Sequence, residues 1–281
     1  MNNNLASPFF DMERDVIGGE DALRPEWLGE ALASSLFSQN IIYLESVDST
    51  NRVAKELSAA GAAEGTLVLA EEQTFGRGRR GRSWLSPKGV NILSSLIVRP
   101  PIDVDQAFVL TMILALAVSD GVRDIAGIRP LIKWPNDLYV GRRKLCGILT
   151  EFSVREGTVD YMILGFGLNV NWYPDDEREL INPATSILRE TGRPANREDL
   201  LVRILSHLDE SYRTFLLGEV TGFYRRWNEL SMILGRDVVI AAGEETLRGV
   251  AVSIDRQGAL ILRDASGVDR VVLNGDVSLS L

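Results

Sequence analysis

The sequence has very few of the residues on which several common kinds of site depend. It holds one cysteine, Cys146, and one histidine, His207, among 281 residues. A single cysteine excludes a disulfide within the chain and a thiolate cluster, and it fits a reducing cytoplasm. One histidine, with no nucleophile motif beside it, argues against a catalytic triad and against zinc chemistry. We therefore expect Cys146 to pack in the core and His207 to have a structural or solvent-facing role.

Other patterns are missing altogether. The chain has no Gly-x-Ser-x-Gly elbow and no Gly-x-x-x-x-Gly-Lys loop, so serine hydrolases and P-loop nucleotidases are not expected. It does not open on a charged segment followed by an apolar one, as a secretory signal does. Its longest apolar stretch, around residues 107–118, is too short to span a bilayer and predicts a buried helix. These absences favour a cytoplasmic protein.

Charge is unevenly distributed. Lysine and arginine number 30 against 39 acidic residues, which gives a net charge of −9, so bulk attraction to nucleic acid is not expected. Residues 76–87 are the local exception, because they read Gly-Arg-Gly-Arg-Arg-Gly-Arg-Ser-Trp-Leu-Ser-Pro. Four arginines alternate here with three glycines, so cationic groups and bare backbone N–H groups can converge on an anion. We call residues 76–87 the arginine–glycine segment and predict that it holds phosphate.

Two other interpretations of this segment have to be considered. Gly76, Gly78 and Gly81 match the spacing of a dinucleotide-binding fingerprint, but such a loop must open a helix. Here Pro87 interrupts the chain and residues 89–98 are rich in β-branched residues, which predicts a strand instead. A solvated arginine run or a nucleic-acid patch is the second alternative. The interleaved glycines and the acidic remainder of the chain argue against it.

The N-terminal third combines a short extension with the start of a larger domain. Residues 1–40 are predicted to be an extension carrying one amphipathic helix, Pro25–Leu36, which is too little for a winged helix-turn-helix. A strand is expected at residues 41–44, and a helix should begin around Ser49-Thr50-Asn51. Plain helix capping explains any one of these polar residues. Four cap-type residues in a row, 48–51, exceed what a cap requires and leave side chains free for a ligand.

The middle of the chain predicts alternating strands and helices. Residues 66–70 form a buried-type strand that delivers Gln73 to the edge of the arginine–glycine segment. A long helix is expected over 103–123, two short strands around the corner Pro135-Asn136-Asp137, strands at 144–152 and 161–171, and a helix over 196–217. We therefore assign residues 41–233 to an α+β catalytic domain with a central mixed sheet flanked by helices.

From residue 234 onward the pattern changes. Short apolar runs at 238–241, 247–254, 259–262, 271–273 and 277–279 alternate with turns that contain glycine. This regular spacing predicts a small antiparallel β-barrel over residues 234–281.

The charged residues of the predicted site limit its chemistry. Lys133 and Lys144 accompany the arginine–glycine segment, and Asp137 is the nearby acid. Such a set supplies little general acid–base power, but it can hold a polyphosphate, bind Mg²⁺ and stabilise charge in a displacement at phosphorus. Nucleotidyl transfer is the reaction class that fits. A carboxylate acceptor would also fit, because the cations offset the repulsion between two anions.

Five motifs together resemble biotin protein ligases from about residue 41 to the C-terminus. They are the arginine–glycine segment, Ser49-Thr50-Asn51, Lys133-Trp134-Pro135-Asn136-Asp137, Lys144-x-x-Gly147-Ile148-Leu149 and Gly165-x-Gly167-x-Asn169. The resemblance implies the ligase fold, in which an α+β domain with a central mixed sheet is followed by a small SH3-like β-barrel. It implies an enzyme that joins biotin to ATP as biotinyl-5′-AMP, with release of pyrophosphate. It further implies that biotin is then transferred to one lysine of a biotin carboxyl carrier protein, as in acetyl-CoA carboxylase.

The same resemblance implies roles for individual residues. Those similar to biotin contacts are Ser49, Thr50, Asn51, Gln73, Arg77, Gly78, Arg79, Lys144 and Gly147. Those similar to ATP contacts are Arg80, Arg82, Lys133, Asn136 and Asn169, with Asp137 on the side of the magnesium ion. Among these, Lys144, Arg79 and Arg77 are implied to be catalytic. For Trp84, core packing and stacking on a ligand both remain open.

Departures from the family pattern set further expectations. Family members that also repress transcription carry an N-terminal winged helix-turn-helix, so we expect ligase activity without DNA binding. An arginine that some members place in the C-terminal barrel is Val252 here, which puts a nucleotide contact from that domain in doubt. The alternatives are a lipoate or octanoyl ligase, which would lack the arginine–glycine segment, and a non-catalytic biotin sensor or DNA-binding regulator. Strand edges permit a homodimer without requiring one.

Overall fold

The computed structural model describes residues 22–38, 40–76, 78–174, 183–243, 245–273 and 275–279, and only the backbone of Arg80. Two sequence-based predictions, the role of Arg77 and the first 21 residues of the N-terminal extension, lie outside the described residues. No helix in the described ranges is long and apolar enough to cross a membrane.

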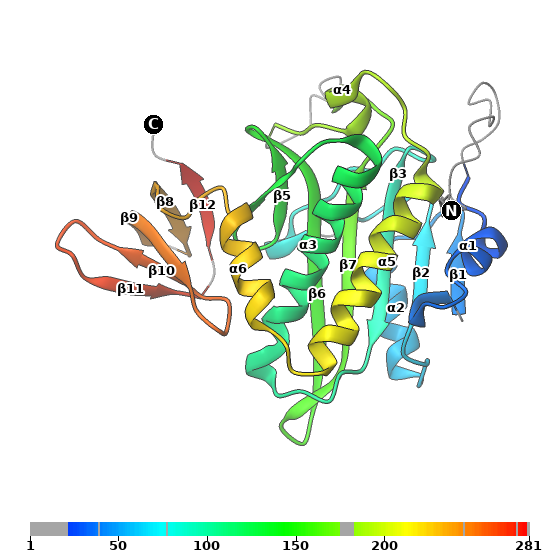
Figure 1. Ribbon diagram of the computed structural model, residues 1–281, viewed down its shortest axis with the longest axis horizontal. Coiled ribbons are helices and arrows are strands. Elements are labelled where there is room, and N and C mark those ends of the chain that lie inside the picture. The colour runs from blue at the N-terminus through cyan, green and yellow to red at the C-terminus, as the bar shows by residue number, and fades with distance from the viewer. Residues whose placement is uncertain are drawn as a thin grey trace, which may run out of the picture.

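A seven-stranded mixed sheet forms the centre of the protein, in the order β1-β2-β3-β7-β6-β5-β4 (Figure 1). β1 pairs with β2 in parallel, and every other pairing is antiparallel. The strands are β1 (Asn40–Leu44), β2 (Thr66–Ala70), β3 (Asn91–Val98), β4 (Leu131–Lys133), β5 (Asp137–Val140), β6 (Arg143–Arg155) and β7 (Thr158–Asn169). This confirms the α+β class with a central mixed sheet.

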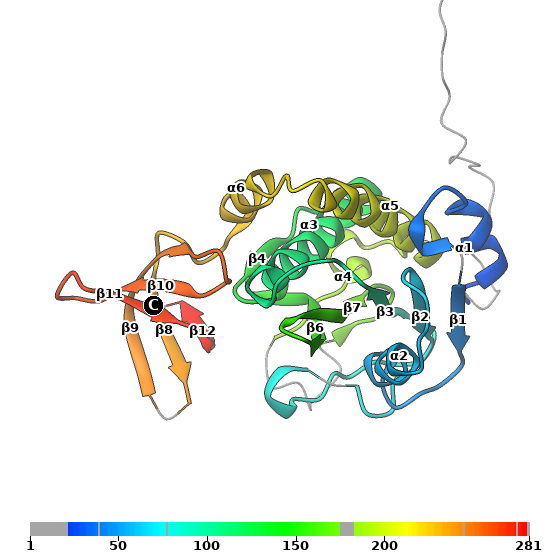
Figure 2. The same cartoon turned by 90° about the horizontal axis from the view of Figure 1, so that it is seen from below.

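Helices cover both faces of this sheet. α3 (Ala107–Ala126), α5 (Arg197–Leu216) and α6 (Thr221–Leu230) lie on one face and α2 (Thr50–Ala59) lies on the other (Figure 2). α3 is buried along most of its length because it is sandwiched between the sheet and α5. A Cβ on Gly121 would lie 2.5 Å from Cγ1 of Ile204, so glycine lets these two helices approach closely. The shorter helical elements are α1 (Pro25–Ala31), η1 (Leu36–Ser38), η2 (Arg79–Gly81), η3 (Val104–Gln106) and α4 (Ile187–Thr191).

The N-terminal helix is shorter than its apolar spacing predicted. The expected helix over Pro25–Leu36 ends at Ala31, and a separate 3-10 turn begins at Leu36. The reason lies in the intervening serines, since Ser35 Oγ accepts a hydrogen bond from the backbone N–H of Phe37 at 3.1 Å and so favours a turn. Apolar spacing did not predict α4, whose five residues are too few to show a helical period.

A second sheet follows from residue 237 onward and confirms the predicted small β unit. Its strands are β8 (Asp237–Ala242), β9 (Glu245–Ile254), β10 (Leu260–Arg263), β11 (Asp269–Val272) and β12 (Asp276–Leu279). They are antiparallel in the order β11-β10-β9-β8-β12. The sheet has its own apolar cluster, which Trp134 of the main sheet joins. Trp134 is buried, and its Nε1 donates to the carbonyl of Gly258 at 2.8 Å, so it attaches the small sheet to the large one.

A buried ion pair fixes the end of β2 close to Gln73. Arg197 of α5 is fully buried, and its Nη1 lies 2.7 Å from Oε2 of Glu71. The same nitrogen donates to the carbonyl of Asn91 at 2.9 Å, where β3 begins. The other carboxylate oxygen of Glu71 accepts from the backbone N–H of Leu23 at 3.0 Å. The guanidinium therefore connects α5 with the end of β2 and the start of β3, which lie side by side in the sheet.

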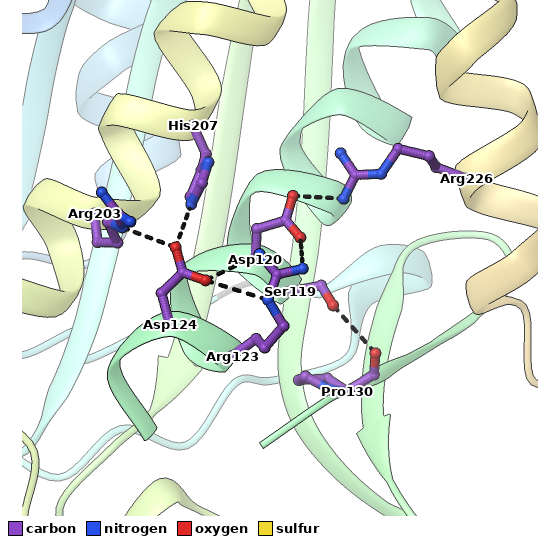
Figure 3. A network of polar contacts seen from close by, with 8 residues as sticks. All are labelled: Ser119, Asp120, Arg123, Asp124, Pro130, Arg203, His207 and Arg226. Atoms are coloured by element: carbon purple, nitrogen blue, oxygen red, sulfur yellow. Dashed lines mark hydrogen bonds and ion pairs between the residues drawn. The ribbon is translucent and has the colours of Figure 1, made fainter. Parts of the chain in front are cut away.

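A second set of charges joins the helices on the outer face (Figure 3). Asp124 of α3 accepts from Nε of Arg203 at 2.8 Å and lies 2.9 Å from Nε2 of His207, both on α5. Asp120, one turn earlier, accepts from Nη2 of Arg226 on α6 at 2.6 Å. His207 thus links two helices on the outer face of the main sheet, in keeping with the structural role expected for it.

We expect this network to make stability depend on pH in the acid range. Burial by itself raises the pKa of Asp124, but hydrogen bonds with His207, Arg123 and Arg203 outweigh it and lower that pKa to about 2. Because the pKa is depressed in the folded state, the stabilisation is present above the unfolded value of about 4 and is lost as the pH falls toward 2. Asp124→Asn should therefore destabilise the protein by roughly 1 kcal/mol at pH 7.

Urea unfolding at several pH values measures this difference. The gap between wild type and Asp124→Asn should narrow between pH 4 and pH 2. Glu219→Gln, which alters an exposed carboxyl between α5 and α6, is the control and should follow wild type throughout. A gap that stays constant down to pH 2 would contradict the assignment to Asp124.

Candidate functional site

Bare glycine backbone forms the floor of the candidate site. Gly147 of β6 lies opposite Gly167 of β7 in the register of the two strands. The indole of Trp84 rests on this floor, since a Cβ on Gly167 would lie 2.6 Å from Nε1 of Trp84 and one on Gly147 would lie 3.0 Å from its Cζ3. A side chain at either position would collide with the ring. Glycine is therefore needed at both positions so that the flat indole of Trp84 can lie on the sheet.

The packing of Trp84 leaves one polar atom unsatisfied. Its Nε1 is buried and finds no hydrogen-bond partner among the described residues. The ring also lies under a cation, because Nζ of Lys144 is 5.4 Å from its centroid. Of the two roles considered for Trp84, the structure shows packing on the sheet, with Nε1 left without a partner among the described residues. Stacking on a ligand stays a prediction.

The start of α2 lies against Gln73. Oε1 of Gln73 accepts from the backbone N–H of Thr50 at 2.8 Å and from the Thr50 hydroxyl at 3.0 Å. Ser49 is the N-cap residue of α2, yet its side chain makes no capping hydrogen bond. Ser49, Thr50 and Asn51 are all buried. These residues therefore do more than cap the helix, and their contact with a ligand stays a prediction.

Asn51 is committed to the sheet. Its Nδ2 donates to the carbonyl of Leu149 at 3.1 Å and to Oε2 of Glu151 at 2.9 Å. Its Oδ1 lies 2.6 Å from Oγ of Ser95. A Cβ on Gly165 would lie 1.9 Å from the same Oδ1, so this glycine makes room for the amide. Asn51 thus anchors α2 on β6 and β3, across Gly165 of β7.

Lysines gather on the other side of the floor. Nζ of Lys144 lies 2.8 Å from Oδ1 of Asp137, in an ion pair about a quarter exposed on each side. Lys133 is paired with Asp137 in the register of β4 and β5, and its Nζ lies 4.9 Å above the ring of Tyr139. Burial lowers the pKa of the Lys133 ammonium, Asp137 opposes this shift, and Lys144 adds to it. Burial likewise raises the pKa of the Tyr139 hydroxyl, so both groups are desolvated.

The corner between β4 and β5 connects this cluster to the arginine–glycine segment. Nδ2 of Asn136 donates to the backbone carbonyl of Ile148. The backbone carbonyl of Asn136 accepts from the N–H of Ile148 at 3.1 Å. Its Oδ1 is 3.5 Å from Nη1 of Arg79. Asn136 is held firmly by β6, and so it places Arg79 over the same corner.

Asn169 ends β7 with a free acceptor. Its Nδ2 donates to the carbonyl of Thr185 at 2.9 Å. Its Oδ1 is buried and has no hydrogen-bond partner within the described part of the chain. A buried amide oxygen in this state carries a cost that a ligand with an N–H group could remove.

The described part of the arginine–glycine segment folds tightly. The N–H of Gly78 donates to the carbonyl of Arg82 at 2.7 Å, and the N–H of Trp84 donates to the carbonyl of Gly76 at 2.8 Å. The guanidinium of Arg82 forms an ion pair with Asp276 of β12. The C-terminal sheet therefore supplies a carboxylate next to the predicted phosphate-holding residues.

Most residues singled out from the sequence come together in two groups. Those on the glycine floor and at the start of α2 are Ser49, Thr50, Asn51, Gln73, Lys144 and Gly147. Those at the β4–β5 corner and along the segment are Gly78, Arg79, Arg82, Lys133, Asn136 and Asp137. Asn169 ends the strand that carries Gly167, whereas Arg77 and the side chain of Arg80 lie outside the described atoms.

Sequence reasoning missed Asp276, because no local pattern distinguishes this aspartate from others in the small sheet. The proximity of Asp276 to Arg82 arises from a fold that joins residues 194 positions apart. Cys146, by contrast, is fully buried as expected, and burial raises the pKa of its thiol.

Comparisons with known proteins agree with this geometry. Residues 43–169 match the biotin/lipoate A/B protein ligase family, and residues 233–280 match the biotin protein ligase C-terminal domain. The chain is 35% identical over 249 residues to the bifunctional ligase/repressor BirA of Bacillus subtilis, covering 88% of this chain and 76% of that protein. It is 34% identical over 231 residues to the biotin–[acetyl-CoA-carboxylase] ligase of Paracoccus denitrificans, covering 80% of this chain and 94% of that one.

This chain belongs to the biotin protein ligase family. A solved biotin protein ligase from Aquifex aeolicus in complex with biotin and ATP superposes with a TM-score of 0.70 at 30% identity, covering 86% of this chain and 99% of that chain. Members of the biotin protein ligase family activate biotin with ATP and transfer it to a carrier protein. The resemblance drawn from the five sequence motifs is thereby confirmed.

The glycine floor makes a direct prediction about packing. Gly167→Ala should push the Trp84 ring off the sheet and destabilise the protein by about 1–3 kcal/mol, because the ring cannot yield as a flexible side chain would. Urea unfolding gives the size of the loss and near-ultraviolet circular dichroism reports the tryptophan environment. Gly222→Ala in α6, where a Cβ would meet nothing within 4 Å, is the control and should be neutral or stabilising. Equal stability of the two variants would contradict this close packing.

Proposed function

We propose that the glycine floor and the lysine cluster beside it are the active site of a biotin protein ligase, in which Lys144 assists the joining of biotin to ATP. The observation that carries this proposal is the position of the Lys144 ammonium, 2.8 Å from Asp137 and 5.4 Å from the Trp84 ring above Gly147. There it can reach both a carboxylate lying on the floor and a phosphate at the β4–β5 corner.

The first step brings two anions together. A carboxylate oxygen of biotin attacks the α-phosphorus of ATP, the bond to the β-phosphate oxygen breaks, and pyrophosphate leaves with its electron pair. Lys144 and Arg79 neutralise the carboxylate and the α-phosphate as charge develops between them. We assign Arg77 to the same task on the sequence motif alone.

The second step transfers biotin to the carrier. The neutral amine of a carrier lysine attacks the carbonyl carbon of the mixed anhydride, the bond from that carbon to the phosphate oxygen breaks, and AMP leaves with the electron pair. The amine nitrogen gives up one proton to the AMP phosphate or to water as the amide forms. Both sites of attack lie on one floor, so the intermediate need not leave it between steps. The acceptor we propose is a biotin carboxyl carrier protein.

The biotin pocket is assigned to the start of α2 and the glycine floor. Thr50 and Gln73 present polar groups held by mutual hydrogen bonds, so their directions are fixed before the ligand arrives. Ser49, Asn51, Gly78 and Gly147 complete this assignment on the sequence motifs, and a ligand touching the backbone of Gly147 would take the place that the Trp84 ring now occupies. Asn51 serves two purposes in this scheme, because its amide also anchors α2 on the sheet.

The nucleotide is assigned to the corner and to Asn169. The unpartnered Oδ1 of Asn169 suits the amino group of adenine, which donates hydrogen bonds. Lys133, Arg82 and Asn136 face the phosphates in this scheme, together with Arg80 on the motif alone. The lowered pKa of Lys133 reflects desolvation, and a phosphate beside it would restore the preference for the charged form.

The residues present also fit a magnesium ion. Mg²⁺ bound with nucleotides takes one or two carboxylates together with phosphate oxygens, and Asp137 supplies one carboxylate at the corner. Within the described residues no group of three acidic, histidine or cysteine side chains could hold a metal without the nucleotide. When bound, the ion would supply positive charge to the phosphates, while Asp137 holds it and Lys144 shares that carboxylate.

Further parts of the proposal concern the chain as a whole. We assign residues 1–40 to an extension, 41–233 to the catalytic domain and 234–281 to the C-terminal domain. With a net charge of −9 the chain is proposed not to bind duplex DNA, and an electrophoretic mobility assay tests this. A cytoplasmic location and a homodimer remain predictions, to be checked by fractionation and by analytical ultracentrifugation.

Substituting Lys144 tests the assignment of the active site. Lys144→Gln should lower the rate of biotin-dependent exchange of pyrophosphate into ATP by about 100-fold or more, because it removes a charge that the transition state needs. Lys88→Gln, on an exposed lysine paired with Glu45, is the matched control and should retain the wild-type rate. Comparable rates for the two variants would place the chemistry elsewhere.

The same exchange assay separates the candidate substrates. Biotin should support exchange, whereas lipoate and octanoate should not. Exchange with lipoate in preference to biotin would favour the lipoate ligase alternative. No exchange with any acid, accompanied by tight biotin binding, would favour a non-catalytic sensor.

A further inference from the structure

The C-terminal sheet reaches the candidate nucleotide site through one short stretch of chain. Trp134 inserts into the apolar cluster of that sheet and donates to the carbonyl of Gly258 at 2.8 Å. A Cβ on Gly275 would lie 2.4 Å from Cγ2 of Ile240 and 3.8 Å from Cζ3 of Trp134, so the chain passes closely over both. Asp276 follows directly and is held by the pairing of β12 with β8. Packing around Trp134 and the pairing of β12 therefore fix where the backbone of Asp276 lies.

Asp276 lies among the cations of the site. Its carboxylate pairs with the guanidinium of Arg82, which the proposed function assigns to the ATP phosphates. The charge of Asp276 also reaches Lys133 and Tyr139. Burial lowers the pKa of Lys133, and Asp137 and Asp276 oppose that shift; burial raises the pKa of Tyr139, and the same two carboxylates add to it. This aspartate is therefore near enough to the β4–β5 corner to repel a triphosphate bound there.

A triphosphate bound at Arg82 would lie next to the carboxylate that now pairs with this guanidinium. Arg82 and Asp276 are 46% and 40% exposed, so water screens their attraction and the pair is worth about 1 kcal/mol or less. A triphosphate carries several negative charges and can displace one screened carboxylate. The pair is strong enough to bias the position of Arg82 and weak enough to be exchanged.

We propose that Asp276 is a positioning residue that holds Arg82 against the C-terminal sheet until the phosphates of ATP take its place, which releases the arginine–glycine segment from that sheet. This inference rests on the proposed function, because it needs ATP as the incoming anion. It gives the C-terminal sheet a role at the nucleotide site through a carboxylate, although Val252 stands where some family members have an arginine.

Titration calorimetry of the full chain with α,β-methylene-ATP and saturating biotin tests the competition. Asp276→Asn removes the charge, so the nucleotide should bind about two- to fivefold more tightly. Adenosine, which has no phosphate, should bind equally to both proteins. Asp276→Glu keeps the charge and should stay near wild type. Asp269→Asn breaks the exposed pair with Arg263 in the same sheet and should leave nucleotide affinity unchanged.

Limited trypsin digestion tests the ion pair without any nucleotide. Mass spectrometry should detect cleavage after Arg82 sooner in Asp276→Asn than in wild type and Asp269→Asn, because the side chain is no longer held. Thermal unfolding of all variants checks that the fold is retained.

Unchanged or weaker nucleotide binding by Asp276→Asn would overturn the inference, as would an unchanged rate of cleavage after Arg82. Failure of the wild-type chain to bind the nucleotide at all would overturn the proposed function instead, and the cleavage rate would still decide whether Asp276 holds Arg82.

Discussion

The antiparallel pairing of β6 with β7 is the interaction on which the site depends. It sets Gly147 opposite Gly167 and so leaves a patch of the sheet without side chains. Because side chains alternate between faces, a shift of one residue in this register would turn the patch toward the opposite face and bring bulky neighbours up in its place. Lys144, three residues earlier on β6, pairs with Tyr139 of β5 and lies above Trp84. The long central strands thus do more than stabilise the fold.

Polar side chains around this floor are held by hydrogen bonds to backbone groups and to one another. Gln73 is fixed through Thr50, Asn136 through Ile148, and Asn51 through Leu149 and Glu151. Such contacts orient ligand-binding groups before a ligand arrives, which lowers the entropy lost on binding. Oδ1 of Asn169 and Nε1 of Trp84 are among the buried atoms that have no hydrogen-bond partner within the described residues. Unsatisfied polar atoms beside a ligand site are where a polar ligand gains most from binding.

The contact between the two sheets lies next to the candidate site. Trp134 belongs to the motif that carries Lys133 and Asp137, and the same residue enters the core of the small sheet. Any motion of the small sheet would therefore act on the corner that holds Asn136 and on the partner of Arg82. In this family member the C-terminal unit is in direct contact with the proposed nucleotide contacts. This unit, residues 233–280, is the part of the chain that matches the C-terminal domain of biotin protein ligases.

Local sequence determined the elements and the chemical class of the site. Apolar periodicity located α3, α5 and the strands of both sheets, and the charged motifs indicated a site for phosphate. Apolar spacing failed at Pro25–Leu36, where serine side chains compete for backbone hydrogen bonds, and it gave no sign of the short α4. Only the tertiary structure decided that Trp84 lies on Gly147 and Gly167, that Arg197 is buried against Glu71, and that Asp276 meets Arg82. Those contacts join residues far apart in the chain, and packing fixes them where no local preference of the backbone can.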